Sequence, residues 1–172
     1  GTLTLNTGNR FHGNNGIPTT LFAAALNELV LTGNGTCLEI TGSGQMTSFA
    51  NIQNLVIENG ATFGNRLTGQ IIGSADHTLT LAGAGNGTGA SAAALAFGNE
   101  TAHTADMTMA HTVHLAAAAT VWVNANRRGI LSGTVNGANH VLTKTGSGEL
   151  VLQGEVKSTS LAVNEGTLNI AD

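Results

Sequence analysis

The sequence predicts an all-β protein whose short strands stack as a parallel β-helix, or β-solenoid. Apolar and polar residues alternate in short bursts, which indicates strands with one buried face. The segments between these bursts are rich in Gly, Asn, Ser and Thr, the residues that form turns. Similar strand-and-turn segments recur along the chain, as expected when each coil stacks on a neighbour. These three features predict about seven coils of roughly 20 to 25 residues each.

Alternating apolar pairs mark the expected strands. From the N-terminus they are Leu3/Leu5, Leu29/Leu31, Leu38/Ile40, Leu55/Ile57, Leu79/Leu81, Val113/Leu115, Val121/Val123, Leu150/Leu152, Leu161/Val163 and Leu168/Ile170. Turn-forming segments lie between them at 32–35, 41–44, 58–62, 82–89, 136–139, 145–148 and 164–167. The spacing of about ten residues between strands also fits a β-sandwich.

Repetition favours the solenoid over the sandwich. Three segments are nearly the same: NELVLTGNG at 27–35, HTLTLAGAG at 77–85 and HVLTKTGSG at 140–148. GELVLQG at 148–154 and GTLNIAD at 166–172 continue the pattern. A sandwich has no structural reason to repeat its segments, whereas a solenoid does.

Two Ala-rich stretches interrupt the strand pattern. Residues 17–29 (IPTTLFAAALNEL) have helical propensity, and Pro18 suits the first turn of a helix. We therefore expect a short helix at 17–29, and residues 90–97 (ASAAALAF) share this character. The alternative for both stretches is that their small residues fill tight corners of the coil.

Composition excludes several classes of protein. The 172 residues are 41% hydrophobic and only 9% charged, with a mean hydropathy of +0.14, which argues against disorder. A net charge of −4 with six Lys plus Arg argues against nucleic acid and anionic membranes as partners. The longest apolar run, Leu115 to Val123, is too short for a transmembrane helix. Cys37 is the only cysteine, so disulfides, multi-Cys zinc sites and CxxC motifs are excluded.

The chain is expected to be one domain, residues 1–172, taken from a longer secreted precursor. Its first residues, Gly1-Thr2-Leu3-Thr4-Leu5, already have the pattern of a strand. They include neither the basic segment nor the apolar segment of a secretion signal. We therefore expect a fragment or a mature piece.

Residues 142–170 carry the most specific pattern. Residues 142–154 are LTKTGSGELVLQG, and residues 161–170 are LAVNEGTLNI. This resembles the passenger-associated transport repeat of bacterial autotransporters, in which LTKxGxGxLxLxG is followed by a connection, a strand, a glycine turn and GTLxV. The connection departs from the family, because EVKST at 155–159 stands where an aromatic-Gly-Thr segment is usual. Gly1 to Leu5 looks like the tail of a preceding copy.

The resemblance implies an autotransporter passenger domain, folded as a right-handed parallel β-helix and displayed on the bacterial surface. We expect the chain to be a non-catalytic structural or adhesive segment that acts as a rigid stalk and display scaffold. Expected partners are neighbouring solenoid segments, copies of itself, and surface glycans or proteins. Because the ends of a solenoid expose unpaired backbone groups, the alternative is a subunit of an extracellular filament, assembled by end-to-end stacking or strand donation.

An enzyme acting on polysaccharides is the weaker alternative. Such reactions need clustered carboxylates, or a basic residue that removes a carbon-bound proton. The ten acidic and six basic residues are scattered. The densest groups are Arg127-Arg128, interpreted as a solvated pair, and Glu149 with Glu155 on either side of one turn. We therefore predict no catalytic residues.

No metal or cofactor site is predicted. His111 and His114, with His103 nearby, are the best metal-ligand candidates, but residues three apart in a strand point to opposite faces. Calcium would have only Asp76, Asp106 and Asp172 as short carboxylates, outside any calcium-binding motif.

The remaining motifs are interpreted as structural. The glycine-rich segment 82–89 lacks the Lys-Ser/Thr of a phosphate loop, which makes it a turn. Glycosylation sequons at Asn34, Asn86 and Asn99 arise easily by chance in a chain rich in Asn and Thr. The pairs Thr2/Thr4 and Thr78/Thr80 are not expected to recur in register, as a flat threonine array would require.

Overall fold

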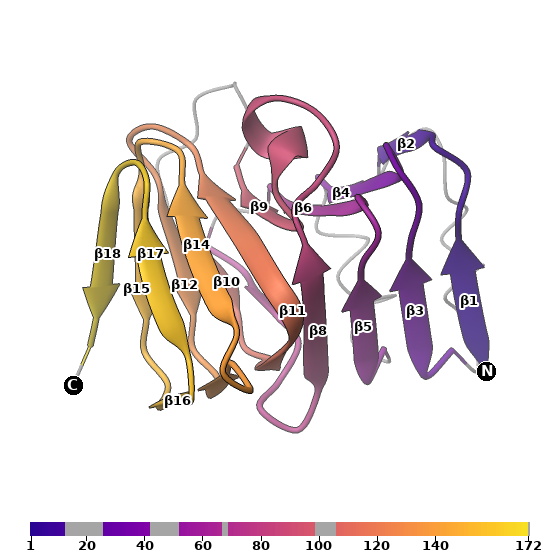
Figure 1. Cartoon of the computed structure of the whole chain (residues 1–172). Coiled ribbons are helices and arrows are strands. Elements are labelled where there is room, and N and C mark those ends of the chain that lie inside the picture. The colour runs from indigo at the N-terminus through magenta and orange to yellow at the C-terminus, as the bar shows by residue number, and fades with distance from the viewer. Residues whose placement is uncertain (13–25, 42–51, 67–68, 99–105, 172) are drawn as a thin grey trace.

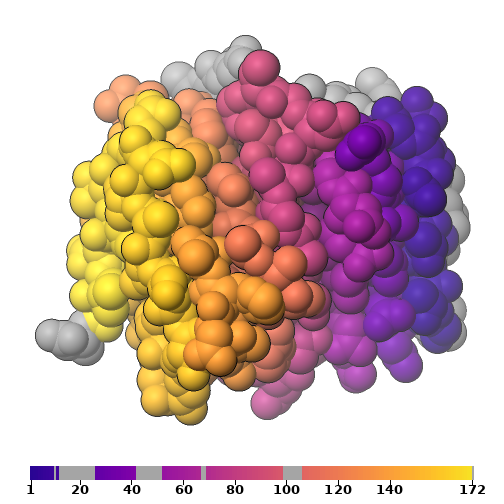
Figure 2. All heavy atoms as spheres, viewed as in Figure 1, coloured from indigo at the N-terminus to yellow at the C-terminus, as the bar shows by residue number. Residues whose placement is uncertain are grey.

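The computed structural model describes residues 1–12, 26–41, 52–66, 69–98 and 106–171, without the side chains of Arg10 and His12. These residues form a nearly all-β protein, and their strand pairs are parallel. The strands form three rows, which the chain visits in turn. The space-filling view shows the chain advancing in successive bands from one end of the molecule to the other (Figure 2). The all-β prediction is confirmed, and the arrangement resembles a solenoid.

The first row begins at the N-terminus. It contains β1 (Thr2–Leu5), β3 (Glu28–Leu31), β5 (Asn54–Ile57), β8 (Thr78–Gly83), the start of β11 (Thr112–Val123), β13 (Val135–Asn136) and β16 (Val156–Lys157). Figure 1 shows β1, β3, β5 and β8 side by side and pointing the same way. Strand register aligns one apolar residue from each strand: Leu3, Leu29, Leu55, Leu79, Val113, Val135 and Val156.

The second row follows the first around a turn. It contains β2 (Arg10–His12), β4 (Cys37–Ile40), β6 (Thr62–Asn65), β9 (Leu95–Phe97), the end of β11, β14 (Val141–Thr145) and β17 (Ser160–Val163). The long strand β11 therefore belongs to both rows, and its register with β8 shifts between Leu115 and Ala119. Residues 115–123, the longest apolar run, lie in this strand. The described residues contain no helix that is long and apolar enough to span a membrane.

The third row forms a separate sheet. It contains β7 (Ile71–Ile72), β10 (Met107–Met109), β12 (Arg128–Leu131), β15 (Glu149–Leu152) and β18 (Thr167–Ile170). β17 and β18 point in opposite directions in Figure 1, since the chain turns back between the second and third rows. Buried residues of all three rows form one continuous core, which includes Leu79, Phe63 and Leu131.

Glycine at position 129 makes room for a phenylalanine in that core. Gly129 is aligned with Met107 on one side and Leu150 on the other, and both of these neighbours are buried. A Cβ atom added at Gly129 would lie 2.5 Å from Cδ2 of Phe97, which is fully buried. The Phe97 ring therefore occupies the volume that a side chain at position 129 would fill.

Gly129→Ala is expected to lower the free energy of unfolding by about 2 kcal/mol, because an added methyl group overpacks a filled core. Chemical denaturation of the purified chain measures this loss. Phe97→Leu in the same chain removes part of the clashing ring, so the double variant should lose less than the two single losses added together. Additive losses would show that Phe97 does not fill this space.

The predicted helix at 17–29 is wrong at its C-terminal end. Glu28 and Leu29 lie in β3, and Leu26 and Asn27 are not helical. Residues 17–25 lie outside the described residues. Leu29 aligns with Leu3 and Leu55 in the buried column of the first row, and this pairing outweighs the helical propensity of the Ala-rich segment.

The second Ala-rich stretch, residues 90–97, combines a short helical turn with small residues that fill a corner. Gly89–Ala92 form a single 3₁₀ turn, designated η2, and Leu95–Phe97 form β9. Ala93, Ala94 and Ala96 are buried. Small residues therefore fill a tight corner here, which is the alternative that the sequence left open.

The segment that resembles a transport repeat consists of two layers stacked on each other. β14 pairs with β17, so that Leu142 aligns with Leu161, and β15 pairs with β18, so that Leu150 aligns with Leu168. The first residues were compared above with the tail of such a repeat, but Thr2 to Leu5 form β1 in the first row, in line with Thr78 to Leu81.

A buried lysine joins these two layers. Lys144 is 1% exposed and stands between Val121 and Val163 in the second row. Its Nζ donates hydrogen bonds to the carbonyl oxygens of Thr145 (2.8 Å), Gly146 (2.5 Å) and Glu165 (3.1 Å). Burial lowers the pKa of the Lys144 ammonium, and the nearby Glu165 carboxylate opposes that shift. The three bonds use every donor of the ammonium group and connect two successive turns.

Candidate functional site

A polar groove lies where strands of the third row begin. Its volume is about 370 Å³, and it is lined by Asp106, Asn126, Arg127, Arg128, Ser147, Gly148, Glu149 and Thr167. Two turns shape it, one before β12 and one before β15. We call these eight residues the polar groove.

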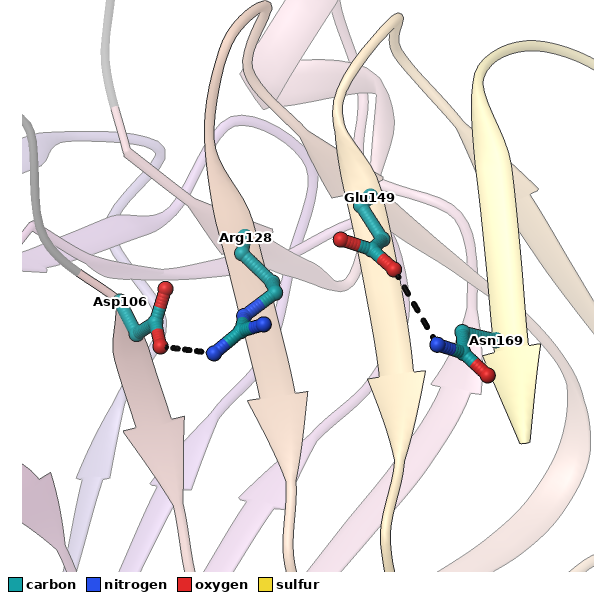
Figure 3. Close-up of polar contacts among 4 residues, drawn as sticks. All are labelled: Asp106, Arg128, Glu149 and Asn169. Carbon is teal, nitrogen blue, oxygen red and sulfur yellow. Dashed lines mark hydrogen bonds and ion pairs between the residues drawn. The ribbon is translucent and has the colours of Figure 1, made fainter. Parts of the chain in front are cut away.

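Strand register places four residues of the groove in one line. Arg128 aligns with Glu149, and Glu149 aligns with Thr167. Asp106 directly precedes Met107, which aligns with the residue after Arg128. Figure 3 shows Asp106 and Arg128 pointing toward each other across neighbouring strands. The order across the strands is therefore acid, base, acid, hydroxyl.

The first two residues of this line form an ion pair. Nη2 of Arg128 donates a hydrogen bond to Oδ2 of Asp106, and the two side chains are 47% and 42% exposed. This hydrogen bond and the Asp106 charge raise the pKa of the Arg128 guanidinium, with a smaller contribution from Glu149. Such an exposed pair is strongly screened by water, and we expect it to orient Arg128 rather than to stabilise the fold.

Glu149 is held from the other side. Its Oε1 accepts a hydrogen bond from Nδ2 of Asn169 at 3.4 Å, as drawn in Figure 3. The carboxylate of Glu149 thus lies between Arg128 and Asn169 on adjacent strands. It retains acceptor capacity for a ligand hydroxyl group, because a carboxylate has about four lone-pair positions.

Arg127 differs from the other basic side chains that the structure describes. Arg66 pairs with Glu39, Arg128 with Asp106 and Lys157 with Glu155, and Lys144 is bound to three carbonyls. Arg127 alone among them has a guanidinium without a hydrogen bond or an ion pair within the described part of the chain.

The backbone presents Arg127 to the groove from a tight turn. The preceding residue, Asn126, adopts a left-handed conformation with φ of 56°. The backbone N–H of Arg127 donates to the carbonyl of Asn124 at 3.2 Å, and its own carbonyl accepts from Glu149 at 2.9 Å. Both backbone ends of Arg127 are therefore fixed where this residue lines the groove.

The structure changes the interpretation of the charged groups found in the sequence. The sequence suggests a solvated pair at Arg127 and Arg128, and the structure adds that both line the groove, together with Glu149. Glu149 and Glu155 do not form a site, because they lie on either side of the strand residues 150–152, and Glu155 pairs with Lys157 at 2.9 Å. Sequence reasoning missed Asp106 and Asn169 as neighbours of these residues, since only strand register reveals them.

The candidate histidine ligands lie in different surroundings, because His111 precedes β11 and His114 lies within it. His111 is buried and His114 is exposed, so these two side chains do not meet, and His103 lies outside the described residues. The described residues contain no group of three or more metal-ligating side chains. Asp76 is exposed in a turn, Asp106 pairs with Arg128, and Asp172 is not described.

One histidine pair was missed. The rings of His77 and His111 lie 6.0 Å apart, and Nδ1 of each is buried without a hydrogen-bond partner among the described residues. Burial lowers the pKa of His111 to about 4, with a further contribution from His77, while a backbone hydrogen bond with Ile72 opposes the shift. The pairing of Thr78 with Thr112 brings the rings together. The shared His-Thr of HTLTL and HTVHL was the available signal.

The structure places the other motifs as follows. Thr36, in the sequon of Asn34, is fully buried and accepts hydrogen bonds from the backbone of Thr7 and Gly8, whereas the sequon of Asn86 is exposed and that of Asn99 lies outside the described residues. Segment 82–89 leads into the one-turn helix η2.

The prediction that the two threonine pairs are out of register is wrong. Through β3 and β5, Thr2 aligns with Thr78 and Thr4 aligns with Thr80. The coils between them carry Glu28/Val30 and Asn54/Val56 at these positions, so no continuous threonine array forms in these strands.

No protein-family model matches this chain, and comparison with curated proteins and with solved structures finds no match. The candidate site therefore depends on its geometry alone.

Proposed function

We propose that the chain is a right-handed parallel β-helix of about seven coils that acts as a non-catalytic scaffold in an extracellular bacterial protein of the autotransporter type. The observation that carries the proposal is the aligned apolar column from Leu3 to Val156, with one residue from each pass of the chain. Right-handed crossovers are the rule between parallel strands, which supports the proposed hand.

The sequence and the stacking of residues 142–170 support the proposed surface location. The two halves of this segment, which resembles a transport repeat, pair as β14 with β17 and β15 with β18. Coil-on-coil contacts of this kind form locally, so a chain threaded through a pore could fold progressively as it emerges. In this proposal the polar groove is a surface on which the scaffold presents a ligand site.

The non-catalytic part of the proposal is tested by incubating the purified chain with a panel of acidic polysaccharides. We expect no new reducing ends and no unsaturated products, because the carboxylates Asp106 and Glu149 are engaged by Arg128 and Asn169. Turnover that is lost in Glu149→Gln would contradict this part and favour a polysaccharide-acting enzyme.

A filament subunit is the second candidate, and the last described coil favours it. Val163 is 48% exposed and Ile170 is 51% exposed, although their equivalents in earlier coils are buried. A further coil stacked on β17 and β18 would cover both. In the filament, the first coil of a second copy supplies this cover.

Size-exclusion chromatography with electron microscopy separates the two candidates. The scaffold predicts monodisperse monomers, and the filament predicts long fibres. If fibres form, the double variant Val163→Lys, Ile170→Lys should abolish them, because charge at both positions opposes burial against another coil. Fibres that persist in this variant would contradict stacking through this end.

A further inference from the structure

We propose that the polar groove binds a uronic-acid residue of a polysaccharide, with the sugar carboxylate held by Arg127. The inference extends the proposed scaffold function by naming the ligand class of its groove. It depends on three features: an unpaired guanidinium, a balance of charge, and a lining without apolar side chains.

The unpaired guanidinium supplies the anion site. Asp106 already neutralises Arg128, while Arg127 has no such partner among the described residues. Arginine presents a planar fork of donors that matches a carboxylate in two parallel hydrogen bonds. A ligand carboxylate is therefore the natural partner for Arg127.

The balance of charge limits how acidic the ligand is. Arg127 and Arg128 bring two positive charges to the groove, and Asp106 and Glu149 bring two negative charges. The whole chain carries a net charge of −4. Sulfated glycans and nucleic acids, with their dense negative charge, would be repelled by the two carboxylates. A sugar residue that carries one carboxylate suits one free arginine.

The lining favours a sugar over a peptide. The groove residues are polar or charged, or are glycine, so an apolar peptide side chain would find no pocket in which to anchor. Glu149, Ser147 and Asn126 offer acceptors and donors for ring hydroxyl groups. The volume of about 370 Å³ is in the size range of small-ligand sites.

Titration of the ¹⁵N-labelled chain with trigalacturonate tests the proposal. We expect the side-chain Nε–H signal of Arg127 to shift on binding. The fully methyl-esterified trisaccharide keeps the ring hydroxyl groups but lacks the charge. Its affinity should be lower by a factor of about ten or more, as expected for loss of a charge-assisted hydrogen bond.

Arg127→Gln should weaken the binding of trigalacturonate by a similar factor of about ten, and should leave binding of the methyl ester almost unchanged. Lys157→Gln is the matched control, because Lys157 is an exposed cation outside the groove lining, paired with Glu155. This control should bind as the parent chain does. Circular dichroism confirms that both variants are folded.

Three results would overturn the proposal. They are no binding of trigalacturonate, equal binding of the acid and its methyl ester, and tighter binding of a heparin disaccharide or an acidic peptide. None of these results would contradict the proposed scaffold function. That proposal is contradicted instead if the chain cleaves polysaccharides or does not fold as stacked coils.

Discussion

Lys144→Met is expected to lower the free energy of unfolding by about 3 kcal/mol, since it leaves three backbone carbonyls without their donor. Methionine nearly matches the length of the lysine stem, so packing between Val121 and Val163 is largely preserved. Removing the ammonium also removes its desolvation cost, which offsets part of the loss. The carbonyls of Thr145, Gly146 and Glu165 are part of the backbone and cannot be replaced by apolar groups.

Urea denaturation of the parent chain and the variant measures this difference. Lys157→Met is the matched control, because Lys157 is 51% exposed and its side chain forms a surface ion pair with Glu155. The control should change the free energy by no more than about 0.5 kcal/mol. Equal losses in the two variants would show that Lys144 does not hold the two turns together. Hydrogen exchange should locate the Lys144→Met loss in residues 145–148 and 164–167.

Local patterns in the sequence are sufficient to predict the all-β class, because strand alternation and turn chemistry are properties of neighbouring residues. The repeated segments do not show which face a strand joins. NELVLTGNG and HTLTLAGAG contribute strands to the first row, whereas HVLTKTGSG contributes one to the second and GELVLQG one to the third. The similarity among these four segments reflects a shared strand-and-turn unit, so it cannot indicate how many units make one coil.

Long-range register decides the features that the sequence analysis missed. Leu29 lies in an Ala-rich stretch, yet pairing with Leu3 and Leu55 makes its segment a strand. Asp106 and Arg128 are far apart in the sequence and belong to no recognisable motif. They meet because Met107 pairs with Gly129. Residue spacing within one strand therefore cannot predict the groove, although the sequence alone identifies its adjacent arginines.

Acid is expected to destabilise the fold through His111. In the unfolded chain this histidine has its ordinary pKa of 6.5, and burial lowers the pKa to about 4 in the folded state. Between these values the unfolded chain binds a proton that the folded chain excludes, so stability falls as the pH falls from about 6.5 to about 4. The full loss, reached below about pH 4, is about 3 kcal/mol.

Packing explains why the folded state excludes this proton. The imidazole lies against Gly73, where an added Cβ would come within 2.1 Å of Cε1 of the ring. His77 lies just before β8, with its ring 6.0 Å from that of His111, and its coulombic effect also lowers the pKa of His111. Nδ1 of His111 has no acceptor in the described residues, so a second proton on the ring would be left without a hydrogen bond.

Urea denaturation at pH values between about 7.5 and 4 tests this prediction in the parent chain, in His111→Gln and in His114→Gln. Carboxylate protonation also contributes to acid unfolding, but it acts equally in all three chains. The parent and His114→Gln should therefore lose about 3 kcal/mol more than His111→Gln over this range. His114 is the matched control because it is exposed in the same segment. If all three chains lose stability in parallel, His111 is not the group that makes the fold sensitive to acid.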